Sequence, residues 1–301
     1  MGPHRTANLI PTWSLGSLLC LLVGLSGAEA RTSAEILDAS SDSDWRQAAP
    51  ANLLYVELPT GTVVFELNPT FAPKHVTNIR HLVAAGYYGG SSVVRSQDNY
   101  VAQWANTADP EPSLGEAVEA LALEFYVPAD ALAATPVSDR DAYAATVSIV
   151  DGFPVASDGE NAWLTHCYGM LGVARGAPDS GNGTSLYVVN GHAPRHLDRN
   201  GTLVGRALVG MEHLSVLPRG TGPLGFYEEP QQPVPLRSVR LGSDLEAAER
   251  LDIQVLRTDT PLFREYLAAR RTRTEDWFAH ATGAIGVCNV PVPTRINAGP
   301  E

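Results

Sequence analysis

The chain has 301 residues, enough for one large domain or for one domain with extensions. Hydrophobic residues make up 44% and charged residues 18%, which is typical of a folded globular protein and excludes a largely disordered one. The formal net charge of −12 argues against nucleic acid as a partner, because binding a phosphate backbone needs a basic surface.

The N-terminus is typical of a secretory signal peptide. Arg5 precedes the apolar run 15–25, and an Ala-Glu-Ala cleavage pattern ends at Ala30. The run is too short for a comfortable membrane span. We therefore expect a signal peptide at residues 1–30, no stable membrane span after its cleavage, and a periplasmic protein; a retained anchor is the alternative.

The next segments predict a leader, a hairpin and a helix. Residues 31–50 are rich in Ser, Asp and Ala and predict a flexible leader. The β-branched runs LLYVEL at 53–58 and TVVFEL at 62–67 are separated by a Pro-Thr-Gly turn, which predicts a β-hairpin. Residues 72–85 have a proline near their start and apolar residues on one face, and Gly86 follows, so they predict an amphipathic helix that packs on the sheet.

The stretch 91–104, SSVVRSQDNYVAQW, is the first candidate for a functional surface. Its alternation predicts two half-buried strands joined by a polar turn. Arg95 and Gln103 then lie among apolar neighbours, and no carboxylate partner for the arginine is close in sequence. Most strand arginines are solvated, so Arg95 alone is weak support for a function. The later stretches strengthen the case for a functional role of Arg95.

Residues 107–161 have the least regular pattern. Pro110 and Pro112 favour a loop, residues 114–125 a helix or an irregular buried segment, and residues 142–150 a strand. A connection of this length inside a compact domain is unusual unless it has structure of its own or a binding task. We therefore expect an insertion here.

The second half of the chain predicts further strands. They are expected at 170–174, 185–189, 202–209 and 236–241, with a short helix at 211–217. Gly205 inside a strand indicates a bend or bulge of the kind that closes a barrel. A C-terminal extension at 244–301 then contains a possible edge strand at 252–256 and a helix within 261–280, whose arginines we expect to be solvated.

Cys167 and Cys288 remain after the expected cleavage. In an oxidising compartment two cysteines can pair, and the sequence leaves the required geometry open. His166 beside Cys167 suggests a base and a nucleophile, but adjacent strand residues point to opposite faces. A structural or disulfide-bonded cysteine is therefore favoured.

Four stretches follow one another in order: VELPTGTVVFELNPTFAPKHVTNIRHLVAAGYY, VVRSQDNYVAQ, LGVARGAPDSGNGTSLYVV and HLDRNGTLVGRALVGMEHLSVLPRG. In order and spacing they resemble those of a known family, the cyclophilin-type peptidyl-prolyl cis-trans isomerases. The resemblance covers residues 53–241, interrupted by the middle of the chain. It implies an eight-stranded closed antiparallel barrel capped by two helices, in a domain at 51–243 that carries the insertion at about 107–161, and it implies neither a cofactor nor a metal.

The resemblance also implies a set of site residues. The family's arginine and glutamine fall on Arg95 and Gln103, which are the predicted catalytic residues. An arginine aimed at a prolyl nitrogen can bond its lone pair only when the amide is twisted, which favours the transition state over either planar form. The predicted substrate-binding residues are Tyr100, Val101, Ala174, Arg175, Ser185, Tyr187, His196 and Leu197.

The implied function is acceleration of rotation about X-Pro bonds and assistance to the folding of exported proteins. We expect a monomer that acts on proline-containing polypeptide clients. The alternative is a catalytically weak or inactive cyclophilin-like module that binds clients or partners in the periplasm. A hydrolase lacks a nucleophile elbow, and a metal enzyme is unsupported because His75 and His81 are six residues apart and HExxH is missing.

Overall fold

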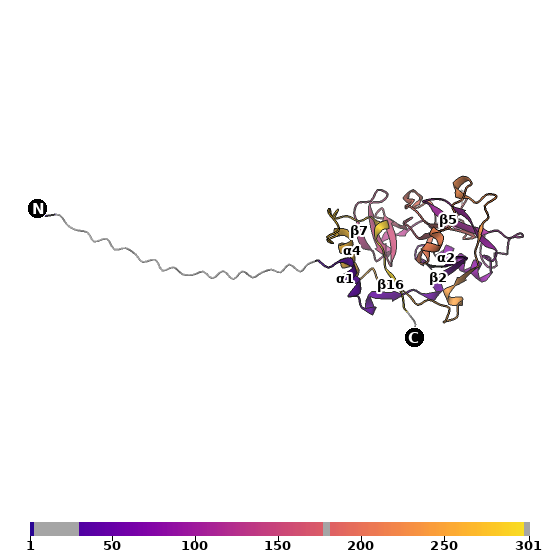
Figure 1. Ribbon diagram of the computed structural model, residues 1–301, viewed down its shortest axis with the longest axis horizontal. Coiled ribbons are helices and arrows are strands. Elements are labelled where there is room, and N and C mark those ends of the chain that lie inside the picture. Colours follow the sequence, from indigo (N-terminus) through magenta and orange to yellow (C-terminus); the bar gives the residue numbers. More distant parts are fainter. Residues whose placement is uncertain (3–29, 177–180, 298–301) are drawn as a thin grey trace. The chain divides into compact units, whose positions relative to one another are not determined.

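The computed structural model describes residues 1–2, 30–176 and 181–297 (Figure 1). The signal peptide predicted at 1–30 lies outside the described residues except at its two ends. No helix in these ranges is both long and apolar enough to cross a membrane. The described residues from Arg31 onward belong to one compact unit.

An antiparallel sheet rich in β-branched residues is the centre of that unit. Its strand order is β14-β4-β5-β12-β11-β13-β3-β2-β15, and it contains the strands predicted at 53–58, 62–67, 91–104, 170–174, 185–189, 202–209 and 236–241. The strands are β2 (Leu53–Leu58), β3 (Gly61–Leu67), β4 (Ser91–Ser96), β5 (Val101–Asn106), β11 (Met170–Val173), β12 (Ser185–Val189), β13 (Leu203–Val209), β14 (Val234–Pro235) and β15 (Ser238–Leu241).

One continuous segment joins the two edges of this sheet. β14 pairs with β4, and β15, three residues further on, pairs with β2. Between them the amide of Leu236 donates to the carbonyl of Ser91, and the amide of Arg237 donates to that of Glu57. When β14 and β15 are counted together as one strand, the sheet has the eight strands of the predicted barrel. The register shift between β11 and β13 falls beside the predicted bulge at Gly205.

Two helices pack on the barrel, as predicted. α2 (Pro73–Ala84) begins at a proline and buries the apolar face formed by Val76, Ile79 and Leu82. α3 (Met211–Ser215) contacts β3 and buries Leu214 in the same apolar cluster. Short 3-10 helices lie in the connections: η1 (Asp42–Asp44), η2 (Pro50–Asn52), η3 (Ala129–Ala131), η4 (Arg195–Leu197), η5 (Pro223–Gly225), η6 (Gly242–Asp244) and η7 (Val287–Asn289).

The insertion forms a sheet of its own. The predicted strand at 142–150 corresponds to β8, whereas residues 114–125 contain no helix and are irregular. The inserted sheet continues to Leu164, so the boundary predicted at 161 cuts through its last strand. Its order is β6-β10-β9-β8-β7, formed by β6 (Val127–Pro128), β7 (Thr135–Ser138), β8 (Thr146–Val150), β9 (Phe153–Ser157) and β10 (Asn161–Leu164).

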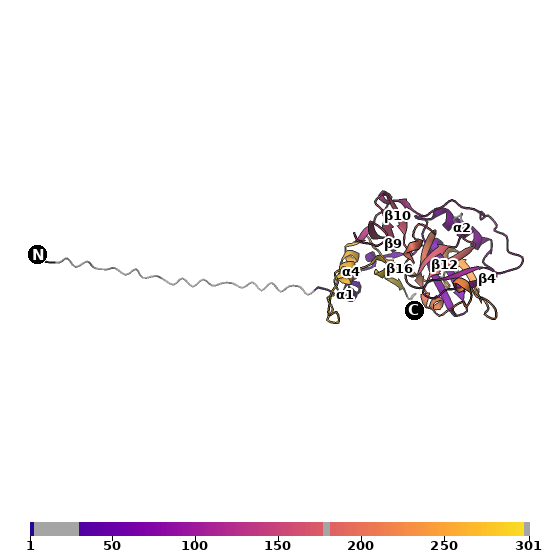
Figure 2. The same ribbon diagram turned by 90° about the horizontal axis from the view of Figure 1, so that it is seen from above.

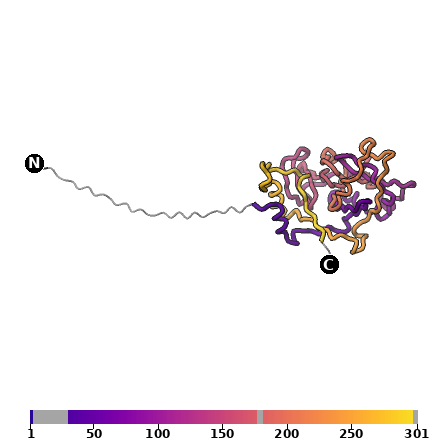
Figure 3. The backbone as a smooth tube through the Cα atoms, viewed as in Figure 1, coloured from indigo at the N-terminus to yellow at the C-terminus, as the bar shows by residue number. Residues whose placement is uncertain are grey.

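The flexible leader predicted at 31–50 is instead folded. It contains α1 (Ser33–Asp38) and β1 (Trp45–Gln47), and β1 pairs with β16 (Ile253–Leu256), which also pairs with β17 (Thr294–Ile296). The prediction was wrong because the partner of β1 is about two hundred residues away, and local composition carries no sign of it. In Figure 3 this early indigo part of the chain lies beside the late yellow part.

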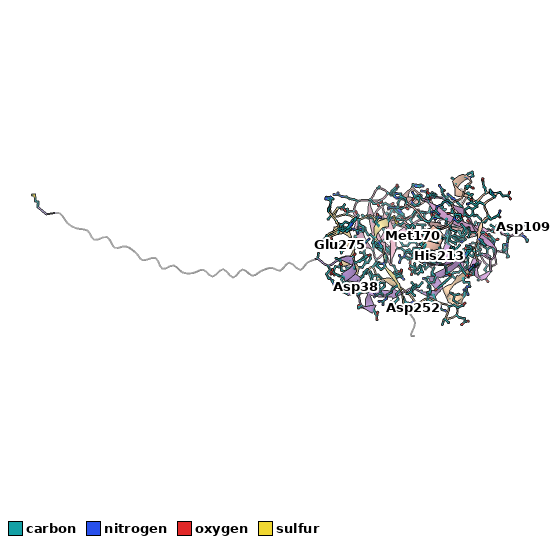
Figure 4. All side chains as sticks on the ribbon, viewed as in Figure 1. Asp38, Asp109, Met170, His213, Asp252 and Glu275 are labelled. Carbon is teal, nitrogen blue, oxygen red and sulfur yellow. A yellow bond between two sulfur atoms is a disulfide. The ribbon has the colours of Figure 1, made fainter. Side chains whose placement is uncertain are left out.

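The C-terminal extension is not a separate body either. Its helix α4 (Pro261–Thr272) lies beside α1 in both ribbon views (Figures 1 and 2). Ile36 of α1 and Phe263 of α4 belong to one apolar cluster with Phe153 and Trp163 of the inserted sheet. Asp38 and Glu275 mark this end of the unit, and Asp109 lies at the opposite end (Figure 4). The N-terminal segment, the insertion and the extension thus share one core.

A disulfide joins Cys167 to Cys288, with Sγ atoms 2.01 Å and Cα atoms 5.0 Å apart. It links the segment before β11 to η7 in the C-terminal extension. The pairing that the sequence left open is therefore made, and a thiolate nucleophile at Cys167 is excluded in this state.

Ile36 allows the folding of the N-terminal segment to be tested. Its side chain is fully buried, so Ile36→Val is expected to lower the free energy of unfolding by about 1 kcal/mol, through lost transfer energy and a small cavity. The same change at Ile296, which is 49% exposed, is the matched control and is expected to have almost no effect. Denaturant unfolding measures both, and equal midpoints for Ile36→Val and the parent would show a mobile leader.

Candidate functional site

The register of the barrel sheet places the candidate site in one row across neighbouring strands. Arg95 of β4 pairs with Gln103 of β5, which pairs with Tyr187 of β12, which pairs with Gly172 of β11. Directly paired residues have their side chains on the same face of a sheet. The arginine, the amide and the aromatic ring predicted from distant stretches therefore come together because the sheet aligns them.

Arg95 is held by neutral groups. Its Nη1 donates to Oε1 of Gln103 at 3.3 Å, its Nη2 donates to Oε1 of Gln97, and its Nε donates to the carbonyl of Leu224 at 2.7 Å. Its Cζ lies 5.7 Å from the ring centroid of Tyr100 and 5.5 Å from that of Phe226. Within the described ranges no carboxylate forms an ion pair with Arg95, so its positive charge is not neutralised locally.

The guanidinium of Arg95 stays charged at neutral pH. Partial burial lowers the pKa of Arg95, and the nearby Tyr100 acts in the opposite direction. The ordinary pKa of arginine lies so far above neutral pH that the group remains protonated. It therefore offers charge-assisted hydrogen bonds in surroundings that are partly shielded from water.

A pocket of about 520 Å³ opens in front of this row. Buried Val101 and Tyr187 contribute apolar surface to it, and Arg95 and Gln103 contribute the polar groups. The predicted residues that line it are Arg95, Tyr100, Val101, Gln103, Ala174, Arg175, Tyr187 and Leu197, and the other lining residues are Val173, Asn200, Gly201, Leu224 and Phe226.

Two predicted substrate-binding residues do not line this pocket but contact residues that do. Oγ of Ser185 accepts from Nε2 of Gln103 at 3.1 Å, which turns the amide oxygen of Gln103 toward Arg95. The ring of His196 is parallel to that of Tyr100, with the centroids 6.2 Å apart. Ser185 therefore orients the glutamine, and His196 packs against the pocket wall.

Tyr187 fits the floor of the pocket because two glycines leave room for it. A Cβ at Gly172 would lie 2.3 Å from Cζ of Tyr187, and one at Gly201 would lie 2.9 Å from its hydroxyl. The hydroxyl is 2.8 Å from Nε2 of the fully buried His166. Burial raises the pKa of Tyr187, and Tyr100 and Asp198 raise it further, so the phenol keeps its proton at neutral pH.

Sequence reasoning missed one wall of the pocket. Leu224 and Phe226 come from the loop after α3, where Phe226 forms an isolated bridge with Arg95. Leu224 has a positive φ of 57° and is 65% exposed, and Phe226 is 37% exposed. The available signal was two apolar residues in a Gly-Pro-Leu-Gly-Phe turn, where nothing else requires large apolar side chains.

A second pocket, of about 850 Å³, lies on the inserted sheet, and it contains none of the site residues predicted from the sequence. Its lining mixes aliphatic residues with polar ones such as Asp139 and Arg140, and the guanidinium of Arg271 that borders it donates to the carbonyl of Val137 at 2.6 Å. The smaller pocket is the candidate functional site because it brings together Arg95 and Gln103, which were predicted from the sequence, and not because of its volume.

The fold and the pocket define a class of protein, an antiparallel β-barrel with an arginine and an amide beside an apolar pocket. Two arginines, Arg95 and Arg175, and the amide of Gln103 border its apolar surface. Among the described residues there is no His, Cys, Asp and Glu cluster that could hold a metal ion. Arg95 and Gln103 offer hydrogen bonds at the site, and the apolar lining offers a surface of defined shape.

The family follows from sequence comparison. The sequence model of the family described as cyclophilin type peptidyl-prolyl cis-trans isomerase/CLD matches residues 53–241, which is more than half of the chain. The chain belongs to the cyclophilin-type peptidyl-prolyl cis-trans isomerase family.

Individual relatives match over different lengths. A probable peptidyl-prolyl cis-trans isomerase of Brucella suis is 41% identical over 56 residues, which are 19% of this chain and 29% of that protein, and its counterpart in Brucella abortus is 39% identical over the same length. The crystal structure of cyclophilin AquaCyp293 from Hirschia baltica matches with a TM-score of 0.69 at 27% identity, covering 90% of this chain and 99% of that chain. The last match extends beyond residues 53–241 into the added elements.

Proposed function

We propose that this protein is a peptidyl-prolyl cis-trans isomerase that acts on proline-containing polypeptides. The observation that carries the proposal is the charged Arg95, which has no carboxylate partner among the described residues and borders an apolar pocket beside Gln103. Rotation about an X-Pro bond must cross a barrier of about 18–20 kcal/mol, because the amide loses its resonance. A site that prefers the twisted amide lowers this barrier.

The arginine supplies that preference because the prolyl nitrogen can accept its hydrogen bond only when the amide is twisted. In a planar amide the prolyl nitrogen has no free lone pair, whereas in the twisted amide it becomes pyramidal and accepts a hydrogen bond. A donor aimed at this nitrogen therefore binds the transition state and not the ground state. No covalent intermediate and no cofactor enter this mechanism.

The remaining groups hold the substrate around that nitrogen. Val101, Tyr187 and Leu197 provide apolar surface for the proline ring. The Nε2 of Gln103 donates a hydrogen bond to Ser185, and the Oε1 of Gln103 accepts one from Arg95. The amide of Gln103 is therefore fixed in one orientation and can bind the substrate backbone. A ring seated on this floor keeps its nitrogen at the arginine while the preceding residue rotates.

We further propose that the protein is exported and assists the folding of exported clients. The signal-peptide pattern at 1–30 and the Cys167–Cys288 disulfide support this proposal, because disulfides persist mainly in oxidising compartments. Cleavage at Ala30 and the periplasmic location can be checked by N-terminal sequencing of protein recovered from a periplasmic extract.

A binding module without catalysis is the second candidate. The observation that favours it is the set of three hydrogen bonds that already hold Arg95 to Leu224, Gln97 and Gln103. The guanidinium must release or share one of these bonds to reach a prolyl nitrogen. If the cost of that release equals the gain, proline peptides bind and rotation is not accelerated.

A rate measurement on a short Ala-Pro peptide separates the two candidates. Uncatalysed isomerisation takes tens to hundreds of seconds at 25 °C, so an acceleration by micromolar protein is directly visible. The proposed function predicts acceleration that a second proline peptide competes away. Binding of the peptide at an unchanged isomerisation rate would instead establish the module.

Phe226 is expected to contribute to binding and not to rotation. Phe226→Ala removes an exposed ring that borders the pocket and faces Arg95, so we expect KM to rise about fivefold and kcat to change by less than twofold. Trp277→Ala removes a more exposed ring, 84% accessible, in the C-terminal extension and serves as the matched control. An equal rise in KM for both variants would mean that Phe226 has no specific role.

A further inference from the structure

A buried chain of polar contacts leads from the pocket floor into the insertion. The hydroxyl of Tyr187 lies 2.8 Å from Nε2 of His166, whose Nδ1 lies 3.0 Å from Oδ1 of Asp198. Nε of Arg195 donates to Oδ2 of Asp198 at 2.5 Å, and its Nη1 and Nη2 donate to the two carboxylate oxygens of Asp141 at 3.1 and 2.9 Å. Asp141 belongs to the insertion, and the other four residues flank the barrel site.

All members of this chain are shielded from water. His166 is fully buried, Tyr187 is 9% exposed, and the side chains of Asp198, Arg195 and Asp141 are 6%, 6% and 12% exposed. Each charged member has a partner of opposite charge. Buried polar groups are costly unless they are bonded in this way, so breaking one contact disturbs the next.

The direction of each hydrogen bond follows from which groups can only donate and which can only accept. Arg195 can only donate, and the carboxylate of Asp198 also accepts from the backbone amide of His166 at 2.9 Å, so this carboxylate acts as an acceptor throughout. Burial opposes the ionisation of Asp198, but hydrogen bonds from His166 and Arg195 outweigh it and lower the pKa of Asp198. Nδ1 of His166 must therefore donate.

A neutral imidazole that donates from Nδ1 has only an acceptor at Nε2. With this form of His166, the hydroxyl of Tyr187 donates its hydrogen bond to Nε2 of His166, and the O–H does not point into the pocket. The same apolar cluster that contains Tyr187 and Val101 continues into Ile149 and Phe153 of the inserted sheet, so packing and hydrogen bonding connect the same two parts.

We propose that His166 and Asp141 are positioning residues of the prolyl site: the insertion anchors Arg195 and Asp198, which fix His166, which keeps the tyrosine hydroxyl of the pocket floor turned away from the substrate. This proposal rests on the proposed isomerase function. The insertion therefore has a functional role at the site, although no residue of the insertion lines the prolyl pocket.

The effect falls on substrate binding. The floor contacts the proline ring in the planar and the twisted amide alike, so a floor disturbed by a rotating hydroxyl weakens both states equally. Uniform weakening raises KM and leaves kcat nearly unchanged, in contrast to the loss of a bond made only in the transition state. The two kinds of residue are therefore separable in kinetics.

A double-mutant cycle tests the role of His166. In His166→Asn the asparagine amide keeps a donor for Asp198 and removes the acceptor for Tyr187, so we expect KM for an Ala-Pro peptide to rise roughly tenfold, the loss of one buried hydrogen bond, at nearly constant kcat. In a Tyr187→Phe background there is no hydroxyl to place. There the same change is expected to alter KM less than twofold.

Asp141→Asn tests the anchor in the insertion and replaces the cycle if His166→Asn fails to fold. We expect KM to rise about threefold, since the contact with Arg195 weakens but remains polar. Asp139→Asn removes the same charge two residues away, from an exposed residue with no ion pair in the described part of the chain, and is expected to match the parent.

Calorimetric binding of the same Ala-Pro peptide is measured for every variant alongside the rate. An inactive parent that still binds the peptide would overturn the proposed function, and the dissociation constants would still decide the positioning role. That role is wrong if His166→Asn weakens binding equally with and without the Tyr187 hydroxyl, if kcat falls at constant KM, or if Asp139→Asn and Asp141→Asn behave alike.

Discussion

Arg95→Ala is expected to lower kcat/KM for an Ala-Pro peptide by about a hundredfold, with most of the loss in kcat. The variant removes the charged donor that is hydrogen-bonded to Gln103 at the pocket wall, and a charge-assisted hydrogen bond made in the transition state contributes about 2–3 kcal/mol. Because the planar peptide does not use that bond, its binding changes little. Progress curves at several peptide concentrations separate kcat from KM.

Arg95→Lys is the informative companion variant. Lysine keeps the charge but lacks the planar fork that now bonds Gln97, Gln103 and the carbonyl of Leu224 at once. We expect it to recover no more than a tenth of the parent activity, because an ammonium cannot hold these partners and aim at the prolyl nitrogen. If Arg95→Ala retained the parent rate, catalysis would have to be assigned elsewhere, and the binding module would become the better description.

The alignment of Arg95 with Gln103 was predictable because it depends on short-range patterns. The alternation of apolar residues in 91–104 and the turn between its two strands are enough to set Arg95 beside Gln103. Tyr187 was placed by resemblance in a different stretch, and the sheet register then puts it opposite Gln103. The Gly-bearing turn at Gly61 likewise fixed the first hairpin.

The missed features depend on partners that are distant in sequence. Residues 31–50 have the composition of a leader, and only pairing of β1 with β16 gives them a fold. His166 looked like a possible base for Cys167, whereas burial against Asp198 and Tyr187 makes it part of a different set. A sequence pattern shows which face of a segment is buried, but it does not name the segment that covers it.

Removal of the disulfide is expected to produce the largest loss of stability. Cys167 and Cys288 are separated by 121 residues, and closing so long a loop restricts the unfolded chain strongly. Chain-entropy arguments give a little under 5 kcal/mol for a loop of this size, and measured losses are typically about 2–4 kcal/mol. We expect the double variant Cys167→Ala, Cys288→Ala to unfold at a temperature lower by roughly 6–12 °C, since each kcal/mol shifts Tm by a few degrees in a domain of this size.

Reduction provides the internal control for that prediction, because it removes the same bond without changing a side chain. A thiol reductant is expected to lower the Tm of the parent toward that of the double variant and to leave the Tm of the double variant unchanged.

The loss of stability is expected to reach the insertion and the N-terminal segment as well as the C-terminal extension, because all three share the apolar cluster in which Cys167 is buried and against which Cys288 packs. Hydrogen exchange of the amides in α1, β8 and α4 measures this spread. Faster exchange in α4 alone would show that the disulfide tethers the extension without stabilising the common core.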